Sequence, residues 1–372
     1  MPGVRVARVV RLALVAMPGA AIAAVVVADI LVGRNVVLGL VVVAPLLAAN
    51  VAGPRLTALY GAAALLAGVL LGFFDDAYQP GDARHAQFIR LGVIAVMSVL
   101  AVFLSQYRLD RERRLTQVTK VADAAQRAIL QPVPEHLGQV HVAVHYESAA
   151  REALVGGDMY GFVHTDHGLR VLVGDVRGKG LDAVRLSAQV LATFRERAGD
   201  SPDLGSLLDR LHLRVAEIAE TDEDFVTAVL VQLTEDGALT VVNAGHPAPI
   251  LLSPDGARLL EVEPSRPPLG LGGTSGMVTA TMRRHDRLLL YTDGLTEARD
   301  PRTRAFLPVQ QIVDAVRARD AVSEAMVELR NQVVRWSGGA LHDDIALVLL
   351  EYLPDAGDER EMTARGVASS LG

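Results

Sequence analysis

The sequence predicts two parts of different fold class, an N-terminal all-α bundle that spans a membrane and a C-terminal α+β domain. The first 104 residues consist mainly of apolar runs and carry seven arginines against four aspartates. The remaining 268 residues carry 29 basic and 39 acidic residues, and strand-like alternation appears only there. The mean hydropathy of +0.30 is therefore an average over two unlike segments.

Four near-continuous apolar segments are each predicted to cross a bilayer, at 12–32, 36–52, 56–74 and 88–104, so that residues 1–104 form a transmembrane domain. None shows the amphipathic period of a helix in a water-soluble core. Basic residues gather before the first segment and after the last, at Arg5, Arg8, Arg11, Arg108, Arg111, Arg113 and Arg114. The positive-inside rule then places both ends, and the C-terminal domain, on the cytoplasmic side of the cell membrane. The first segment also resembles a cleavable signal peptide, and its loss would leave that orientation unchanged.

Residues 105–131 are predicted to form a helical connector. From Leu115 to Ile129, apolar residues recur with a three-four spacing that is typical of one face of an amphipathic helix. That face either packs on the following domain or forms a parallel homodimer through residues 115–129, and two heptads do not decide between them. Pro132 and Pro134 end the helix. The next domain is predicted over 132–352, followed by a disordered tail over 353–372.

The C-terminal part has the pattern of a layered α+β domain. Strands are predicted at 140–146, 168–176, 225–233, 239–243, 287–291 and 345–350, and helices at 181–198, 204–219, 309–316 and 322–336. The segments 234–237 and 253–256 have the composition of hairpin turns. Strands in hairpins together with paired helices indicate antiparallel sheets and not a doubly wound parallel sheet.

Composition excludes several classes of function. The chain has no cysteine, so disulfide frameworks, thiolate metal sites and cysteine nucleophiles are excluded. The acidic balance of the C-terminal part argues against nucleic acid as a partner, because nucleic-acid phosphates attract clusters of lysine and arginine.

Acidic residues stand at the edges of the predicted strands in four short motifs. These are Gly156-Gly157-Asp158, the segment Gly174–Gly180 with Asp175, Thr292-Asp293-Gly294, and the segment Leu341–Ile345 with Asp343 and Asp344. Each alone is an ordinary turn sequence. Together, carboxylates at converging strand ends would repel one another unless a cation balanced them. Oxygen ligands without cysteine or a histidine cluster favour Mg²⁺ or Mn²⁺.

The order and wording of these motifs resemble a known family. From Ala125 to Tyr352 the chain is similar to the SpoIIE/RsbU-like branch of the metal-dependent protein phosphatases, relatives of protein phosphatase 2C. The matching segments are Gln126–Pro132, the four acidic motifs and Asn243-Ala244-Gly245-His246-Pro247. The resemblance implies an αββα sandwich of two antiparallel sheets flanked by helices, and hydrolysis of phosphoserine or phosphothreonine in a protein.

The resemblance also implies roles for individual residues. Two divalent cations, Mn²⁺ or Mg²⁺, would be bridged by Asp175 with help from the carbonyl group of Val176. Asp293 and Asp343 would hold the first cation, and Asp158 would bind a metal ion or its waters. Asp344 stands beside a ligand position and is a secondary candidate. One departure is visible, because Gly161 occupies a position where family members often have a second acid.

Two further residues are candidates for contacts with the substrate. With two cations, water attacks phosphorus directly and no covalent intermediate is needed. Lys179 would contact the phosphate or only complete a glycine turn. His246 would protonate the leaving oxygen or only support its own turn.

The resemblance suggests that the substrate is a phosphorylated anti-sigma-factor antagonist or a similar small regulatory protein. Two alternatives remain open. A membrane-bound nucleotide cyclase would also combine a helical bundle with a two-metal carboxylate site. A catalytically dead phosphatase-like domain would serve as a membrane-tethered binding module, although retention of the four main aspartates argues against it.

Overall fold

The computed structural model describes residues 2–32, 38–148, 156–221, 223–339, 341 and 343–354. The chain divides into two compact units, Met1–Thr116 and Gln117–Gly372. The tail predicted to be disordered lies outside the described residues, apart from Leu353 and Pro354.

The first unit consists of apolar helices. It contains α1 (Pro2–Val32), the 3-10 helix η1 (Leu38–Val42), α2 (Val43–Val51), α3 (Pro54–Phe74) and the first part of α4 (Asp82–Ile129). Among the described residues, three helical stretches are long and apolar enough to cross a membrane: Ala13–Leu31, Pro54–Phe74 and Asp82–Arg114. The sequence predicted a further span at 36–52. The structure has a shorter apolar helix there, Gly39–Val51, which ends just before Gly53 and Pro54 begin α3, and the span stays a prediction.

Small residues let α3 approach α4 closely within this unit. A Cβ atom added to Gly61 would lie 2.8 Å from the Cβ of Ser98. Gln87 donates a hydrogen bond of 2.9 Å to the carbonyl oxygen of Gly68. Close contact through small residues, together with hydrogen bonds between helices, is typical of helices packed in lipid. Large apolar side chains remain exposed on the outer surface, among them Leu59, Phe73, Phe88, Val96 and Val99.

The second unit contains two antiparallel sheets. The first has the order β1-β2-β11-β10-β7-β8 and the second has the order β3-β4-β5-β6-β9. The strands of the first sheet are β1 (His136–Leu137), β2 (Val140–Glu147), β7 (Ile250–Ser253), β8 (Gly256–Leu259), β10 (Arg287–Tyr291) and β11 (Ile345–Tyr352). Those of the second are β3 (Met159–Thr165), β4 (Gly168–Val176), β5 (Val226–Leu233), β6 (Ala238–Ala244) and β9 (Val278–Thr281).

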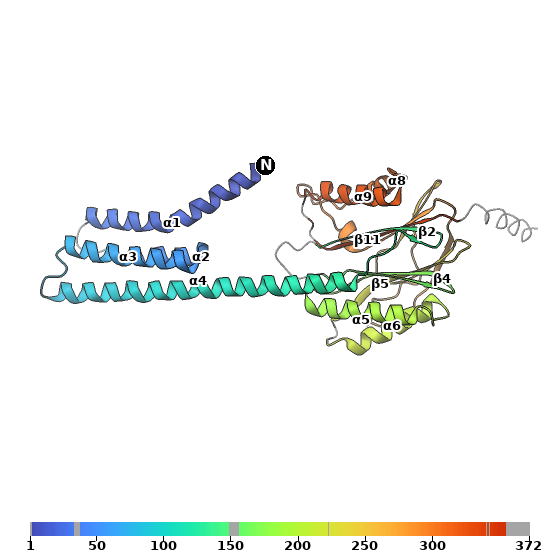
Figure 1. Cartoon of the computed structure of the whole chain (residues 1–372), viewed down its shortest axis with the longest axis horizontal. Coiled ribbons are helices and arrows are strands. Elements are labelled where there is room, and N and C mark those ends of the chain that lie inside the picture. The colour runs from blue at the N-terminus through green and yellow to red at the C-terminus, as the bar shows by residue number, and fades with distance from the viewer. Residues whose placement is uncertain are drawn as a thin grey trace, which may run out of the picture. The chain divides into compact units, whose positions relative to one another are not determined.

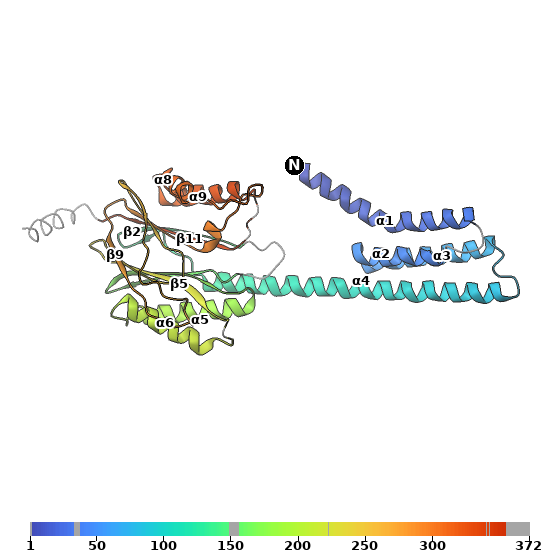
Figure 2. The same cartoon turned by 180° about the vertical axis from the view of Figure 1, so that it is seen from behind.

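Helix pairs cover the outer faces of both sheets. Helices α8 (Val309–Arg317) and α9 (Val322–Trp336) lie on the first sheet, and α5 (Leu181–Arg197) and α6 (Leu204–Ile218) lie on the second (Figure 1). The view from behind shows the same four layers (Figure 2). One apolar core fills the space between the sheets and under α5 and α6, and another lies under α8 and α9. The predicted αββα sandwich is confirmed.

The last turns of α4 pack on the sandwich. Ala125 and Ile129 contact Val184 of α5, and Arg195 donates a hydrogen bond of 2.9 Å to the carbonyl oxygen of Ile129. Part of the apolar seam of the connector is therefore used against its own domain. The homodimer through residues 115–129 stays a prediction, since the side chains of Val118 and Ala122 lie outside those that the structure describes.

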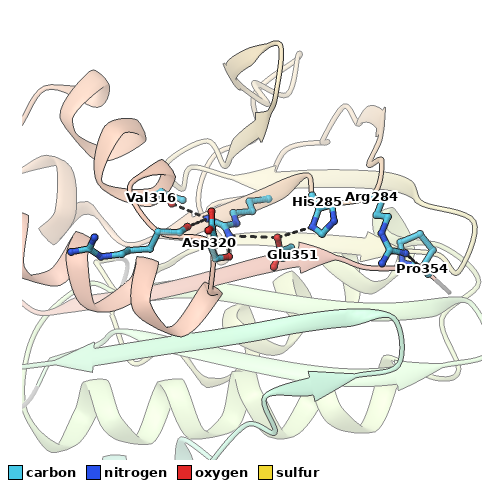
Figure 3. Close-up of polar contacts among 8 residues, drawn as sticks. Arg284, His285, Val316, Asp320, Glu351 and Pro354 are labelled. Atoms are coloured by element: carbon cyan, nitrogen blue, oxygen red, sulfur yellow. Dashed lines mark hydrogen bonds and ion pairs between the residues drawn. The ribbon is translucent and has the colours of Figure 1, made fainter. Parts of the chain in front are cut away.

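A polar cluster closes the end of the first sheet where β10 starts and β11 ends. Arg287 donates hydrogen bonds to the carbonyl oxygens of Val316 and Arg319, at 2.9 and 2.8 Å, and also binds the carbonyl of Asp320. Its guanidinium lies 3.5 Å from a carboxylate oxygen of Glu351, which His285 approaches from the other side (Figure 3). This cluster anchors the turn between α8 and α9 and leaves the opposite end of the sandwich for the acidic motifs.

Candidate metal centre

The carboxylates of the four acidic motifs meet at one end of the sandwich. Antiparallel pairing sets Met159, at the start of β3, opposite Gly174 near the end of β4. In the other sheet it sets Tyr291, at the end of β10, opposite Leu347 near the start of β11. Asp158 and Asp175 are therefore neighbours in one sheet, and the residues after β10 and before β11 are neighbours in the other. The five aspartates named from the sequence lie at these strand ends: Asp158, Asp175, Asp293, Asp343 and Asp344.

Asp158 is buried and is held from the opposite sheet. Only 2% of its surface is exposed. The hydroxyl group of Thr292 donates a hydrogen bond of 2.7 Å to its Oδ2 atom and accepts one of 2.9 Å from the backbone N–H of Ala346. Thr292 thus holds the Oδ2 atom of Asp158, and the Oδ1 atom takes no part in this hydrogen bond. Although Thr292 belongs to a motif singled out in the sequence, only the structure gives it this function.

The glycine pair before Asp158 permits a close approach of two loops. A Cβ atom at Gly157 would lie 2.3 Å from the carbonyl oxygen of Val176 and 2.8 Å from Oδ1 of Asp175. A Cβ atom at Gly156 would lie 1.5 Å from Oδ2 of Asp344. Side chains at these positions would separate Asp158 from the other carboxylates, so the chemistry of the site requires glycine here.

The site carries more negative charge than its surroundings balance. Burial raises the pKa of Asp158 well above its usual range, and the nearby Asp175 carboxylate adds to this effect. Burial, followed by repulsion from Asp293, raises the pKa of Asp175 to about 7. The pKa of Asp293 is also raised, by burial and then by repulsion from Asp343 and Glu297. A bound cation would remove this repulsion.

The remaining acidic residues already have polar partners. Lys179 lies with its Nζ atom 2.6 Å from Oδ1 of Asp343, and this contact raises the pKa of the lysine. Asp344 is buried, and its Oδ1 atom accepts a hydrogen bond of 2.6 Å from the hydroxyl group of Ser148. Lys179 therefore lies at the edge of the carboxylate cluster.

The donor set suits hard divalent cations. Its side chains are carboxylates and the carbonyl group of Val176 faces the Gly157 loop, a combination that favours Mg²⁺ or Mn²⁺ over softer metals. Within the part of the chain that the structure describes, no three of these groups already form a metal cage.

Gln126, on the last turn of α4, holds the loop that carries Asp158. Its side chain is 2% exposed, and its Nε2 atom donates hydrogen bonds of 3.1 Å to the carbonyl oxygens of both Gly156 and Asp158. The sequence placed Gln126 in a family motif without assigning it a function. Its position shows that the end of the connector helix supports the candidate metal centre directly.

His246 links the two sheets beneath the carboxylates. Its Nε2 atom lies 3.1 Å from the carbonyl oxygen of Tyr291 and its Nδ1 atom lies 2.9 Å from the hydroxyl oxygen of Thr227. Because a carbonyl oxygen only accepts, Nε2 carries the proton and Nδ1 accepts from Thr227. Burial lowers the pKa of His246 to about 3, so the ring is neutral. With both nitrogens engaged inside the protein, His246 supports the strand ends that carry Asp175 and Asp293.

Gly161 lies away from the carboxylates. A Cβ atom there would lie 3.1 Å from Leu191 and 3.2 Å from Phe194, both on α5. The position that often carries a second acid in the family thus faces an apolar layer in this chain. A carboxylate at 161 would be buried among apolar side chains, which makes glycine the compatible residue.

The chain matches a known protein family over about half of its length. Residues 165–353 match the family model described as Stage II sporulation protein E (SpoIIE).

One solved structure shares the fold at low sequence identity, and two others are similar to parts of the chain. The SiaA-PP2C domain of Pseudomonas aeruginosa is 18% identical, with a TM-score of 0.57, and the match covers 65% of this chain and 98% of that one. RsbU and RsbW domains from Mycobacterium tuberculosis are 23% identical, with a TM-score of 0.49, over 57% of this chain and 60% of that one. The PP2C domain with a regulatory fragment of SpoIIE from Bacillus subtilis is 17% identical, with a TM-score of 0.49, over 57% of this chain and 63% of that one.

Proposed function

Because the chain belongs to the SpoIIE family, we propose that it is a membrane-anchored, metal-dependent phosphatase that removes phosphate from serine or threonine of a cytoplasmic protein. The observation that carries the proposal is the convergence of Asp158, Asp175 and Asp293, whose pKa values are all raised by burial and mutual repulsion. Such a cluster is costly in a protein unless it binds cations.

Each residue of the centre has a definite task in this mechanism. Two bound divalent cations would supply an activated water and neutralise charge on the phosphoryl group. Asp175, the carbonyl group of Val176, Asp293 and Asp343 would hold these cations, with Asp158 binding a cation or its waters and Asp344 as a secondary ligand. Thr292, Gln126 and His246 keep the carboxylates in place through their hydrogen bonds. Lys179 would turn from Asp343 to an oxygen atom of the phosphate.

The location and the substrate are part of the proposal. Three apolar helices long enough to span a membrane precede the sandwich. The arginines at 108, 111, 113 and 114 favour a cytoplasmic position for the segment that leads into it. We infer that the substrate is a small phosphorylated regulatory protein. Membership of the SpoIIE family favours an anti-sigma-factor antagonist. A comparison of the phosphoproteome with and without the gene would identify it.

The test is hydrolysis by the full-length protein reconstituted in lipid nanodiscs. With Mn²⁺ we expect release of phosphate from p-nitrophenyl phosphate and from a phosphoserine peptide, and loss of both activities when the metal is removed with EDTA. Asp175→Asn should abolish hydrolysis, whereas Asp166→Asn, at an exposed turn, should not.

Three results would contradict the proposal. Equal rates for the parent and for Asp175→Asn would exclude the metal assignment. Formation of a cyclic nucleotide from ATP or GTP with Mn²⁺, without phosphatase activity, would favour the cyclase alternative. A protein that binds phosphopeptide but never hydrolyses it would be the binding module.

A further inference from the structure

A small cavity of about 260 Å³ adjoins the candidate metal centre. Gly294 and Asp343 form the wall on the side of the centre, and Arg299 and Arg304 come from the loop that follows α7 (Asp293–Thr296). We call this cavity the arginine pocket. Its volume is below the range of about 300 to 1,000 Å³ that is usual for sites of whole small molecules, so it suits a single side chain.

Neither arginine of the pocket has a carboxylate partner among the described residues. The guanidinium of Arg299 lies 4.4 Å from the centroid of the Phe306 ring, a contact that orients the group and leaves its N–H donors available. The guanidinium of Arg304, which is exposed, has no hydrogen bond or ion pair within the described part of the chain. By contrast, Arg287 at the other end of the same sheet donates hydrogen bonds to several carbonyl oxygens.

The loop that carries the two arginines is held rigidly. Arg299 and Phe306 form an antiparallel bridge, and Asp300 Oδ1 accepts hydrogen bonds of 2.8 and 2.7 Å from the backbone N–H groups of Arg302 and Thr303. The N–H group of Arg304 donates to the carbonyl oxygen of Asp300 at 2.9 Å, with Arg304 in the left-handed region at φ 62°. A preorganised loop lowers the entropic cost of binding a ligand.

Charge favours an anionic occupant once the centre is loaded. The pocket also contains the carboxylates of Glu297 and Asp343. In the proposed function the charge of Asp343 is balanced by a cation. The two positive charges of the arginines then exceed the single negative charge of Glu297. Arginine binds carboxylates through two parallel hydrogen bonds, which gives this pairing geometric specificity.

We propose that the arginine pocket binds an acidic side chain of the protein substrate, a few residues from the phosphoserine or phosphothreonine. The inference rests on the proposed function, because the phosphate at the metal centre brings the neighbouring substrate residues over the pocket. Arg299 and Arg304 then determine specificity and take no part in breaking the P–O bond.

The test compares phosphopeptides that differ in one charge. Full-length protein in nanodiscs with Mn²⁺ is given a phosphoserine peptide with glutamate at each of the three positions on either side in turn, and the matched glutamine peptides. We expect one position at which glutamate raises kcat/KM by about tenfold or more, mainly through KM. In the double variant Arg299→Gln/Arg304→Gln this ratio should fall to about one.

Matched variants make the result specific. Arg302→Gln changes an exposed arginine of the same loop outside the pocket, and it should keep the ratio of the parent. Arg304→Glu should prefer a lysine peptide at the same position. Thermal unfolding of each variant confirms folding. An equal ratio in the parent and the double variant, or no preference at any position, would overturn the proposal.

A free anion as the occupant of the pocket is tested with acetate, since inorganic phosphate would also bind at the proposed metal centre. If the pocket serves such an anion, acetate will change the rate on the neutral peptide in the parent and not in the double variant. That result also overturns the proposal, because the pocket would then not be reserved for a side chain of the substrate.

Failure of the proposed function is distinguished from failure of the pocket. If the parent hydrolyses neither p-nitrophenyl phosphate nor any peptide, the proposed function fails. Fluorescence anisotropy of labelled phosphopeptides then tests the pocket separately. Only a pocket that binds an acidic side chain gives tighter binding of the glutamate peptide than of the glutamine peptide.

Discussion

Gln126, at the end of α4, donates a hydrogen bond of 3.1 Å to the carbonyl oxygen of Asp158, although 32 residues separate them in the sequence. The same amide group also binds the carbonyl oxygen of Gly156. A residue of the connector is therefore part of the support of the candidate metal centre, as residues behind the ligands usually are in metalloenzymes.

Replacing Gln126 should weaken metal binding. In Gln126→Leu two buried carbonyl oxygens lose their partner, and the loop that carries Asp158 is no longer fixed. We expect the affinity for Mn²⁺, measured by isothermal titration calorimetry, to fall about tenfold or more. Gln131→Leu is the matched control, because Gln131 is exposed just beyond the helix. Unchanged Mn²⁺ affinity in Gln126→Leu would show that this contact does not position Asp158.

Removing one carboxylate should stabilise the metal-free protein while abolishing its function. In Asp175→Asn the repulsion with Asp158 and Asp293 is reduced, so the unfolding midpoint in EDTA should rise by a few degrees. Addition of Mn²⁺ should stabilise the parent and have little effect on this variant. Thermal unfolding of both proteins, with and without Mn²⁺, measures the two effects. A variant less stable than the parent in EDTA would indicate that Asp175 is not under repulsion.

The metal-free protein should lose stability as the pH rises through about 7. The pKa of Asp175 is about 7 in the folded chain, and the usual value is 3.8. An acid whose pKa is raised by folding contributes stability that is complete below its unfolded pKa and is lost as the pH passes its folded pKa. Unfolding midpoints in EDTA should therefore fall between about pH 4 and 7, and this slope should be smaller in Asp175→Asn. A midpoint that rises over this range in the parent would contradict the assignment.

His246 should act through structure and not as an acid. His246→Leu removes both hydrogen bonds of the ring, and we expect a loss of about 1 to 3 kcal/mol in the free energy of unfolding. Hydrolysis of phosphoserine peptide and of p-nitrophenyl phosphate should fall by the same factor, because a loss of structure affects both substrates alike. Nitrophenolate needs no proton to leave, so loss of a proton donor would slow only the phosphoserine peptide. His164→Leu, at an exposed position on β3, is the control. A loss confined to the phosphoserine peptide would instead identify His246 as the proton donor.

The packing of α3 on α4 should depend on Gly61. In Gly61→Leu the added side chain meets Ser98, whereas Gly92→Leu places the same side chain where no atom lies within 4 Å. Overpacking of this kind typically costs about 1 to 3 kcal/mol. The fraction of protein that stays monodisperse in detergent on heating should fall for the first variant and not for the second. Equal behaviour would mean that the two helices do not need this close contact.

Much of the sandwich can be predicted from the sequence, because its central strands are long and have clear apolar patterns. β4 and β10 have the predicted bounds, and α9 ends at Trp336 as predicted. β1, β3, β7, β8 and β9 were not predicted as strands, although the hairpin turn between β7 and β8 was. β3 contains Gly161, β1 has two residues, and β7, β8 and β9 have four residues each, too few for a periodic pattern to distinguish them from loops.

The sequence predicts which acidic residues gather at the candidate site, but it does not predict the residues that hold them in place. Asp158, Asp175 and Asp293 stand in recognisable motifs at strand ends, so their convergence was expected. Gln126 and Thr292 act through single hydrogen bonds across the fold, which no local spacing reveals. The arginine pocket is likewise invisible in the sequence, because the spacing of Arg299 and Arg304 does not differ from that of the chain's many other arginines.

The glycine at position 157 sets how closely two loops of the candidate metal centre approach each other. Any side chain there would meet backbone atoms of Val176, at 2.3 and 2.7 Å, which cannot rotate aside as a side chain can. A homologous sequence with another residue at this position must widen the gap between the two loops and separate its acids. In the proposed function, a substitution at this single codon would keep the scaffold and lose the reaction.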